Sequence, residues 1–258
     1  MYRIFALTLV ILVSACANEV EKGLGSQPAL SSLVVAFDEV SSEALGDSAS
    51  RIIRQMISDS EIEVRALLPS LPDSILVNIE VVDRDIDVVG GVSGRAEAPG
   101  KVTIQLSSTY PGGILAAAET ALSSTIFHEF HHLFRGWTIQ DNRFGQGIPI
   151  AAVNEGLASV FSETYTGVYF KAAYSCPEDV ADWLAEIQAL PTDANYQIWM
   201  MGKHPDGRNS IGYRVGRFII HRAAKQSGKG IIELSMLSPD EILAMAEKTE
   251  FTTAQILL

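Results

Sequence analysis

The segment His128-Glu129-Phe130-His131-His132 places two histidines four residues apart, with a glutamate directly after the first. On an α-helix, side chains at positions i and i+4 project from one face, so His128 and His132 could bind a single metal ion. Imidazole nitrogens are common zinc ligands, and a neighbouring carboxylate such as Glu129 can take a proton from the attacking water. The pattern therefore predicts zinc-dependent hydrolysis with Glu129 as the general base. The alternative is that the same pattern arose by chance on an amphipathic helix.

The helix that must carry this motif is predicted over residues 114–135, and Gly136 is well placed to end it. His128 and His132 fall on a stripe of smaller and polar residues, so we expect them to face a cleft. The positions expected to face the core are Ala118, Leu122, Ile126, Phe130 and Leu133. His131 lies off the polar stripe, and we expect it to be a surface histidine or to support a ligand, not to bind the metal.

A second helix is predicted from the apolar spacing of residues 153–161, and Glu155 opens it. A carboxylate on such a helix can fold back beside the two imidazoles. The resulting two-histidine, one-glutamate set leaves one position open for water, as catalytic zinc sites do. The alternative is a glutamate that only stabilises the N-terminus of its helix.

HEFHH followed by Asn-Glu-Gly-Leu-Ala resembles the gluzincin metallopeptidases, and HEFHHLFR, then NEGLA, then IGYRVG carries a narrower resemblance. More narrowly, it resembles a bacterial family of predicted zinc-dependent proteases that includes secreted and lipid-anchored forms, over about residues 75–251. The resemblance implies that Zn²⁺ is held by His128, His132 and Glu155 and that the substrate is a peptide or protein. Ser159 departs from thermolysin-like gluzincins, which usually carry an Asp four residues after the ligand that orients a ligand histidine. A serine can still accept an imidazole N–H, but it makes the ligand less basic.

Related zinc peptidases place a Tyr or His on a following helix as a hydrogen-bond donor to the oxyanion. Tyr213, at the start of a helix predicted over residues 211–226, is the first choice for this role. Arg214, His204 and Tyr165 are the alternatives, and ordinary packing would also explain each of them.

The N-terminus predicts a lipoprotein signal peptide over residues 1–15. Arg3 precedes a short apolar run, and the run ends in Val13-Ser14-Ala15-Cys16, which resembles a bacterial lipobox. We expect Cys16 to carry a lipid that anchors the chain to the bacterial cell envelope. Ala17 after it favours the outer membrane, with the protein facing the periplasm. The alternatives are an ordinary signal peptide and a buried N-terminal helix.

Composition indicates a folded protein with one main domain. The chain has 258 residues, of which 47% are hydrophobic and 19% charged. Its net charge of -12 and the lack of any Lys/Arg run argue against nucleic acid as a partner. We expect a flexible tether over residues 16–32 and a metallopeptidase-like domain over residues 33–258. Cys176 has no Cys or His near it in sequence and is expected to be an idle thiol.

The predicted fold class is α+β, with a small sheet whose edge strand lies beside the HExxH helix and with a largely helical C-terminal half. Residues 33–68 predict two or three helices, interrupted near Gly46 and residues 58–60. Strands are predicted at residues 74–82 and 101–106, and a surface turn or hairpin at residues 83–100. The strand at residues 101–106 could be a sheet edge that takes up an extended peptide, or it could be covered. Further helices are predicted at residues 177–189 and 242–248.

A function from another class is also compatible with these motifs. The chain could be a lipid-anchored binding or chaperone-like module whose zinc site is structural or vestigial. A hydrolase that acts on something other than a peptide would carry the same metal ligands, because specificity depends on the shape of the cleft.

Overall fold

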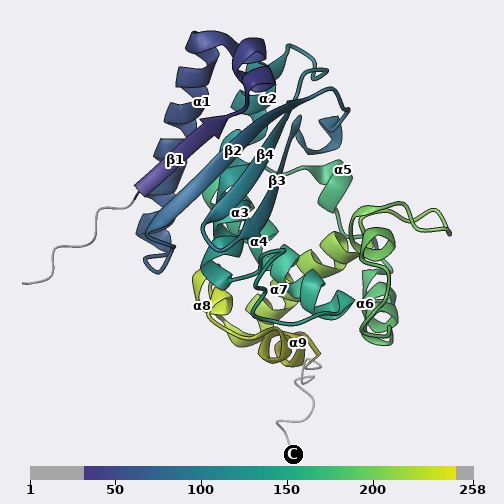
Figure 1. Ribbon diagram of the computed structural model, residues 1–258. Coiled ribbons are helices and arrows are strands. Elements are labelled where there is room, and N and C mark those ends of the chain that lie inside the picture. The colour runs from purple at the N-terminus through teal and green to yellow at the C-terminus, as the bar shows by residue number, and fades with distance from the viewer. Residues whose placement is uncertain (1–31, 248–258) are drawn as a thin grey trace, which may run out of the picture. The chain divides into compact units, whose positions relative to one another are not determined.

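A computed structural model describes residues 32–247 (Figure 1). This part of the chain has the α+β fold that the sequence predicts: a four-stranded sheet packed against helices, followed by a helical C-terminal half. The predicted signal peptide, the lipidated Cys16 and nearly all of the tether lie outside the described residues. None of the described helices is both long enough and apolar enough to cross a membrane.

The sheet has the strand order β1-β2-β4-β3. Its strands are β1 (Ser32–Phe37), β2 (Ser74–Val82), β3 (Val92–Ala98) and β4 (Lys101–Ser107). β2 pairs in parallel with both β1 and β4, whereas β3 pairs antiparallel with β4. β3 is therefore an edge strand.

Helices cover one face of the sheet. Along β2, the buried residues Ile75, Val77 and Ile79 alternate with partly exposed ones, as expected for a strand with one face in the core. They share a core with α1 (Glu39–Leu67) and with the helix that carries HEFHH. Asp38 caps α1 by accepting a hydrogen bond from the Ser41 backbone N–H at 2.7 Å.

The HEFHH motif lies on the long helix predicted for residues 114–135. This helix consists of α2 (Ile114–Ala117), a π-helical turn (Ala118–Leu122) and α3 (Ser123–Arg135). Gly136 ends it with φ = 72°, a left-handed conformation that glycine adopts without strain. All five residues expected to face the core are buried.

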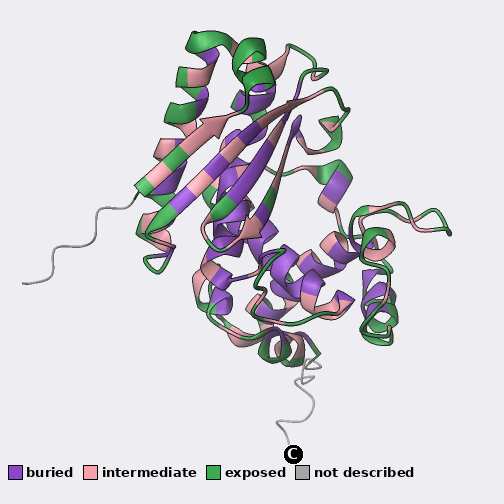
Figure 2. Ribbon diagram, in the orientation of Figure 1, coloured by how far each residue is buried: buried purple, intermediate pink, exposed green. Residues whose placement is uncertain are grey.

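The C-terminal half forms a second core around α4 and α7. Its helices are α4 (Ile148–Thr166), α5 (Lys171–Tyr174), α6 (Val180–Gln188), α7 (Ile211–Ser227), α8 (Ile231–Ser235) and α9 (Pro239–Glu247), with a π-helical turn at Gln197–Met201. α4 and α7 cross at Gly156 and Gly216, where a Cβ atom on Gly216 would collide with the Ala152 carbonyl. Most residues of α3 and α4 are buried (Figure 2).

Two predictions for the N-terminal part were wrong. Residues 32–37 form β1, because a short apolar run is compatible with a buried strand as well as with a helix. Two helical segments follow within α1. The break between them at Gly46 was predicted, but the second segment continues through residues 58–60, where Ser60 Oγ donates to the Met56 carbonyl.

The predictions for the hairpin region need a similar correction. Residues 83–100 are more than a surface turn, because they include β3, which forms the predicted hairpin with β4. The strand predicted at residues 101–106 is β4, which lies between β2 and β3 and so is not the edge of the sheet. The edge strand beside the HExxH helix is β3.

Candidate metal centre and cleft

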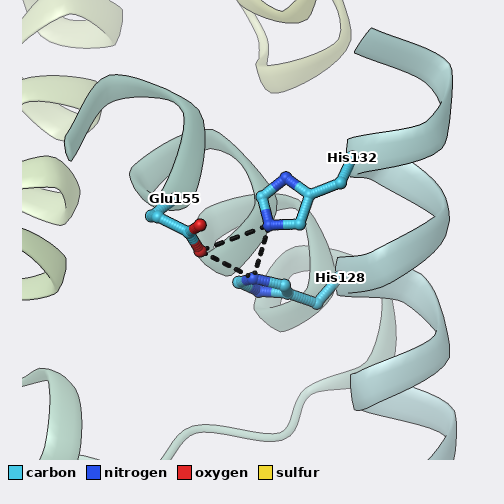
Figure 3. Close-up of side chains that lie close together, drawn as sticks. All are labelled: His128, His132 and Glu155. Atoms are coloured by element: carbon cyan, nitrogen blue, oxygen red, sulfur yellow. Dashed lines mark hydrogen bonds and ion pairs between the residues drawn. The ribbon is translucent and has the colours of Figure 1, made fainter. Parts of the chain in front are cut away.

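Three side chains from two helices converge on one point. His128 and His132 extend from α3, and Glu155 reaches them from α4 (Figure 3). The two histidine Nε2 atoms lie 3.0 Å apart, and Glu155 Oε2 lies 3.1 Å from His128 Nε2 and 3.2 Å from His132 Nε2. For ligand bonds of about 2.0 to 2.1 Å, neighbouring ligand atoms of a tetrahedral zinc ion are about 3.3 Å apart. The spacing of these three atoms therefore fits a single zinc-sized ion.

The chemistry of the three side chains also fits a cation. The Glu155 side chain is buried, and burial alone would raise its pKa. His132 and His128 outweigh that effect and hold the pKa of Glu155 well below its usual value, so the carboxylate is ionised. Two imidazoles and one ionised carboxylate are a typical donor set of catalytic zinc sites.

Glu155 lies further inside its helix than we expected. α4 begins at Ile148, two turns before the glutamate, because Pro149 at the first turn is compatible with a helix start. The prediction that Glu155 opens the helix was therefore wrong. Because Glu155 does not lie at the N-terminus of α4, the alternative explanation, a favourable interaction with a helix N-terminus, does not apply.

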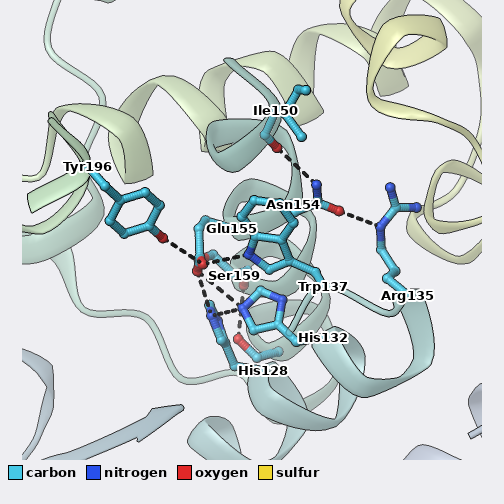
Figure 4. A network of polar contacts seen from close by, with 10 residues as sticks. His128, His132, Arg135, Trp137, Ile150, Asn154, Glu155, Ser159 and Tyr196 are labelled. Carbon is cyan, nitrogen blue, oxygen red and sulfur yellow. Dashed lines mark hydrogen bonds and ion pairs between the residues drawn. The ribbon is translucent and has the colours of Figure 1, made fainter. Parts of the chain in front are cut away.

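The second oxygen of Glu155 has its own partners (Figure 4). Trp137 Nε1 donates a hydrogen bond to Glu155 Oε1 at 3.1 Å, and the Tyr196 hydroxyl donates to the same atom at 3.4 Å. Neither residue was predicted as part of the site. Trp137 follows the end of α3 and Tyr196 precedes a π-helical turn, so neither belongs to a motif or a periodic pattern.

The helices that carry the ligands are also joined directly. Arg135 Nε donates to Asn154 Oδ1 at 2.8 Å (Figure 4). Arg135 Nη1 donates to the Ser235 and Leu237 carbonyls. Asn154 adjoins the candidate ligand Glu155. This buried arginine therefore fixes α3 against α4 and α8 close to the metal centre, and its burial lowers its pKa to about 10.

Glu129 lies beside the cluster and against the edge strand. The residue is 5% exposed, and a Cβ atom on Gly94 of β3 would lie 2.6 Å from Glu129 Oε1. Burial raises the pKa of Glu129 to about 7, and a hydrogen bond from the Ala96 backbone acts in the opposite direction. A carboxylate with such a pKa can accept and release a proton near neutral pH.

Two cavities open on either side of Glu129. One, of about 480 Å³, lies on the His128 side and is lined by Thr125 and Tyr174. The other, of about 760 Å³, lies on the His132 side and is lined by Trp137 and Tyr196. The residues that line both are Gly94, Arg95, Glu129, Met201 and Tyr213. A chain-like ligand could therefore extend past Glu129 in both directions.

Of the four candidate oxyanion donors, the structure brings Tyr213 to the cleft. Burial, followed by the charge of Glu155, raises the pKa of Tyr213 well above its usual value, so its hydroxyl keeps its proton. The other three candidates line neither cavity. Arg214 donates to the Ala172, Ser175 and Asn209 carbonyls.

The other two candidates are likewise engaged elsewhere. His204 pairs with Asp206 and packs on Trp199. Tyr165 is 37% exposed and packs on Phe161. These contacts hold both side chains away from the three candidate ligand atoms.

His131 and Ser159 differ from the expectations for them. His131 is fully buried and not on the surface; its Nε2 is hydrogen-bonded with Ser235 Oγ at 2.8 Å, away from the three ligand atoms. Ser159 Oγ is buried, and within residues 32–247 neither it nor His132 Nδ1 has a hydrogen-bond partner. The expected support of a ligand histidine by Ser159 is therefore not present.

Comparison with known sequences agrees with this geometry. No curated protein and no solved structure matches the chain. A family described as "Predicted Zn-dependent protease (DUF2268)" matches residues 49–244, a span that includes β2 to β4, all three candidate ligands, Glu129 and Tyr213. Because this match covers most of the sequence, the chain belongs to that family of predicted Zn-dependent proteases.

Proposed function

We propose that the protein is a zinc metallopeptidase of the gluzincin type, in which His128, His132 and Glu155 bind Zn²⁺. The observation that carries this proposal is the convergence of His128 Nε2, His132 Nε2 and Glu155 Oε2 at distances of 3.0, 3.1 and 3.2 Å. A structural zinc site would be closed by a fourth protein ligand. Here three candidate ligands face a cleft, so one position is left for water and substrate.

In the proposed mechanism, Glu129 is the general base. Bound zinc would polarise the scissile carbonyl and make the attacking water more acidic. Glu129, which lies buried beside the candidate ligands, takes a proton from that water and passes it to the leaving amine. Tyr213, whose hydroxyl stays protonated, donates a hydrogen bond to the oxyanion.

The cleft favours a peptide or protein substrate over a small molecule. Cavities lie on both sides of Glu129, and the exposed apolar side chains Val88, Ile139 and Met201 line them. Such a groove can hold several residues of an extended chain, with apolar contacts at its rim.

The proposal is tested with Glu129→Gln in the zinc-loaded protein. The isosteric amide cannot accept the proton, so we expect a loss of at least about a hundredfold in kcat on a cleavable peptide, with stoichiometric zinc retained. Peptide cleavage is followed by mass spectrometry on a peptide library, and zinc by atomic absorption. Glu119→Gln, an exposed position on the same long helix, is the matched control and should retain activity. Full activity of Glu129→Gln would refute the mechanism; bound zinc without cleavage of any peptide would favour a binding module instead.

We also propose that the chain is lipid-anchored through Cys16 to the bacterial outer membrane and faces the periplasm. The basis is the lipobox-like segment of residues 13–16. Expression in a bacterial host should give a membrane-bound form that incorporates labelled fatty acid, and Cys16→Ser should lose the label. Equal labelling of both forms would exclude Cys16 as the anchor.

A further inference from the structure

The charged side chains of the cavity on the His128 side are unevenly compensated. Those that line it, besides the candidate ligand, are Arg84, Arg95, Glu129 and Glu163. Arg217 from α7 donates hydrogen bonds to both carboxylate oxygens of Glu163. Arg95 Nε pairs with Glu97 Oε1 at 3.0 Å. Within residues 32–247, Arg84 makes no ion pair, and its side chain is hydrogen-bonded only to neutral groups. Apart from the proposed base Glu129, Arg84 is therefore the charged residue of this cavity that lacks a counter-charge.

The Arg84 side chain is nevertheless held in a defined position. Its Nη2 donates to Gln105 Oε1 at 2.8 Å and to Ser93 Oγ at 3.4 Å. These two partners face each other across β3 and β4. Gln105 is fixed in turn, because its Nε2 donates to Glu80 Oε2 at 2.7 Å, and the Arg84 carbonyl accepts from Ser107 Oγ at 2.8 Å. The guanidinium is therefore placed at the cavity before a ligand arrives, which reduces the entropy lost on binding.

The guanidinium of Arg84 keeps unused donors. A guanidinium has five N–H groups on three nitrogens, and in the described part of the chain the Arg84 Nε and Nη1 make no hydrogen bond. Arg84 is not part of a generally basic surface either, because the chain has 31 acidic and 19 basic residues. An uncompensated positive charge with free N–H donors is suited to bind a carboxylate.

We propose that Arg84 binds a carboxylate of the peptide substrate and thereby makes the protein selective for an acidic group on the His128 side of the scissile bond. This inference rests on the proposed peptidase function. The carboxylate belongs to an Asp or Glu side chain or to the C-terminus of the substrate, because both present the same two oxygens. Arg84 is thus a specificity-determining residue and takes no part in the proton transfers.

The selectivity should be limited to one side of the scissile bond. Among the described residues, Arg95 is the one Lys or Arg that lines the cavity on the His132 side, and its charge is compensated by Glu97. Asp193 adds a negative charge to that cavity. An acidic group of the substrate therefore finds no uncompensated arginine there.

The first test compares acidic and neutral peptides with the zinc-loaded wild-type protein. One C-terminally amidated peptide that mass spectrometry shows to be cleaved is substituted at each position around the scissile bond with Glu and, separately, with Gln, which has nearly the same size. We expect kcat/KM to be about fivefold higher for Glu than for Gln at a position on one side only, mainly through KM, and this ratio should fall at high salt. The free-acid form of each peptide distinguishes a terminal carboxylate from a side chain. No preference for either carboxylate, or an equal preference on both sides, would overturn the inference.

Variants of Arg84 assign the preference to this residue. Arg84 is exposed, so its substitution leaves the buried core intact. Arg84→Gln should reduce the Glu-to-Gln ratio to about one, and Arg84→Glu should favour Lys over Glu at the same peptide position. Arg51→Gln removes an exposed arginine of α1 that lines neither cavity, and this matched control should keep the wild-type ratio. A preference that persists in Arg84→Gln would refute the assignment.

A binding measurement separates this inference from the proposed function. Zinc-loaded Glu129→Gln is titrated with a fluorescent Ala-rich peptide that contains Glu and with its Gln counterpart, and the two Kd values are measured by anisotropy. The Glu peptide should bind about fivefold more tightly, and adding Arg84→Gln to the variant should abolish the difference. Failure of the wild-type protein to cleave any peptide would count against the proposed function, whereas equal Kd values for the two peptides would count against the role of Arg84 alone.

Discussion

Trp137 Nε1 donates a hydrogen bond to Glu155 Oε1 at 3.1 Å, while Oε2 of the same carboxylate faces both histidines. The indole thereby fixes which oxygen is turned to the metal position. A neutral donor on the outer oxygen also leaves the carboxylate its negative charge. Trp137 therefore acts as the hydrogen-bond partner that orients a candidate metal ligand, although its side chain is neither a carboxylate nor a carbonyl.

Trp137→Phe should weaken zinc binding. Phenylalanine retains most of the ring but has no N–H, so Glu155 can rotate away from the orientation that suits the metal. Loss of a partner of this type costs about 10- to 100-fold in metal affinity. Competition with a chromogenic chelator measures the change. Trp199→Phe is the matched control, because Trp199 packs on His204 and is not among the hydrogen-bond partners of Glu155 in residues 32–247, and it should bind zinc as the wild type does. Equal zinc affinity in Trp137→Phe and wild type would contradict the assigned role.

Gly94→Ala should abolish hydrolysis while zinc stays bound. An added Cβ would lie 2.6 Å from Glu129 Oε1, so the carboxylate must move away from the attacking water. A displacement of about 1 Å at a reacting group can cost a hundredfold in rate. Gly230→Ala controls for the substitution itself, because a Cβ atom there meets nothing closer than Glu233 Oε2 at 3.7 Å. Zinc content and kcat are measured on both variants, and a Gly94→Ala protein with wild-type kcat would show that this contact does not position the base.

Tyr213→Phe should lower kcat by about a hundredfold with little effect on zinc content, because removal of one oxyanion donor typically costs that much. Tyr165→Phe removes a hydroxyl that lies outside both cavities and should leave kcat unchanged. Full kcat in Tyr213→Phe would contradict the role assigned to Tyr213. The next candidate donor would be Tyr196, whose hydroxyl lies 3.4 Å from Glu155 Oε1.

The sequence predicted the parts of the candidate site that lie on regular helices. His128 and His132 are four residues apart, so helical geometry alone brings them to one face. Glu155 was found through the chemistry of a third ligand. The position of Glu155, two turns inside α4, was not predicted, because the helix start at Ile148 falls in a segment rich in glycine and proline.

Hydrophobic periodicity could not predict the residues near the candidate site that lie in loops or at the sheet edge. β3 contains Gly94 and lacks a run of β-branched residues, so its segment resembles a turn. Gly94 is needed there because Glu129 occupies the space of a side chain. Trp137 and Tyr196 reach Glu155 only through the tertiary fold, and no local pattern indicates such contacts.

The stability of the metal-free protein should depend on pH through Glu129. Burial raises the pKa of this carboxyl from 4.5 to about 7, so between these values the folded protein retains a proton that the unfolded chain has released. The contribution of Glu129 to the free energy of unfolding is therefore fully present below about pH 4.5. It is lost as the pH rises through 7, which lowers the free energy of unfolding by roughly 3 kcal/mol. Glu129→Gln removes that loss, so its free energy of unfolding should exceed that of the wild type at pH 8 and match it near pH 4.5. Urea unfolding with a chelator present at the two pH values measures the difference. The exposed control Glu119→Gln should show no such divergence, and a Glu129→Gln difference that does not grow with pH would mean that this carboxyl is not buried in the folded protein.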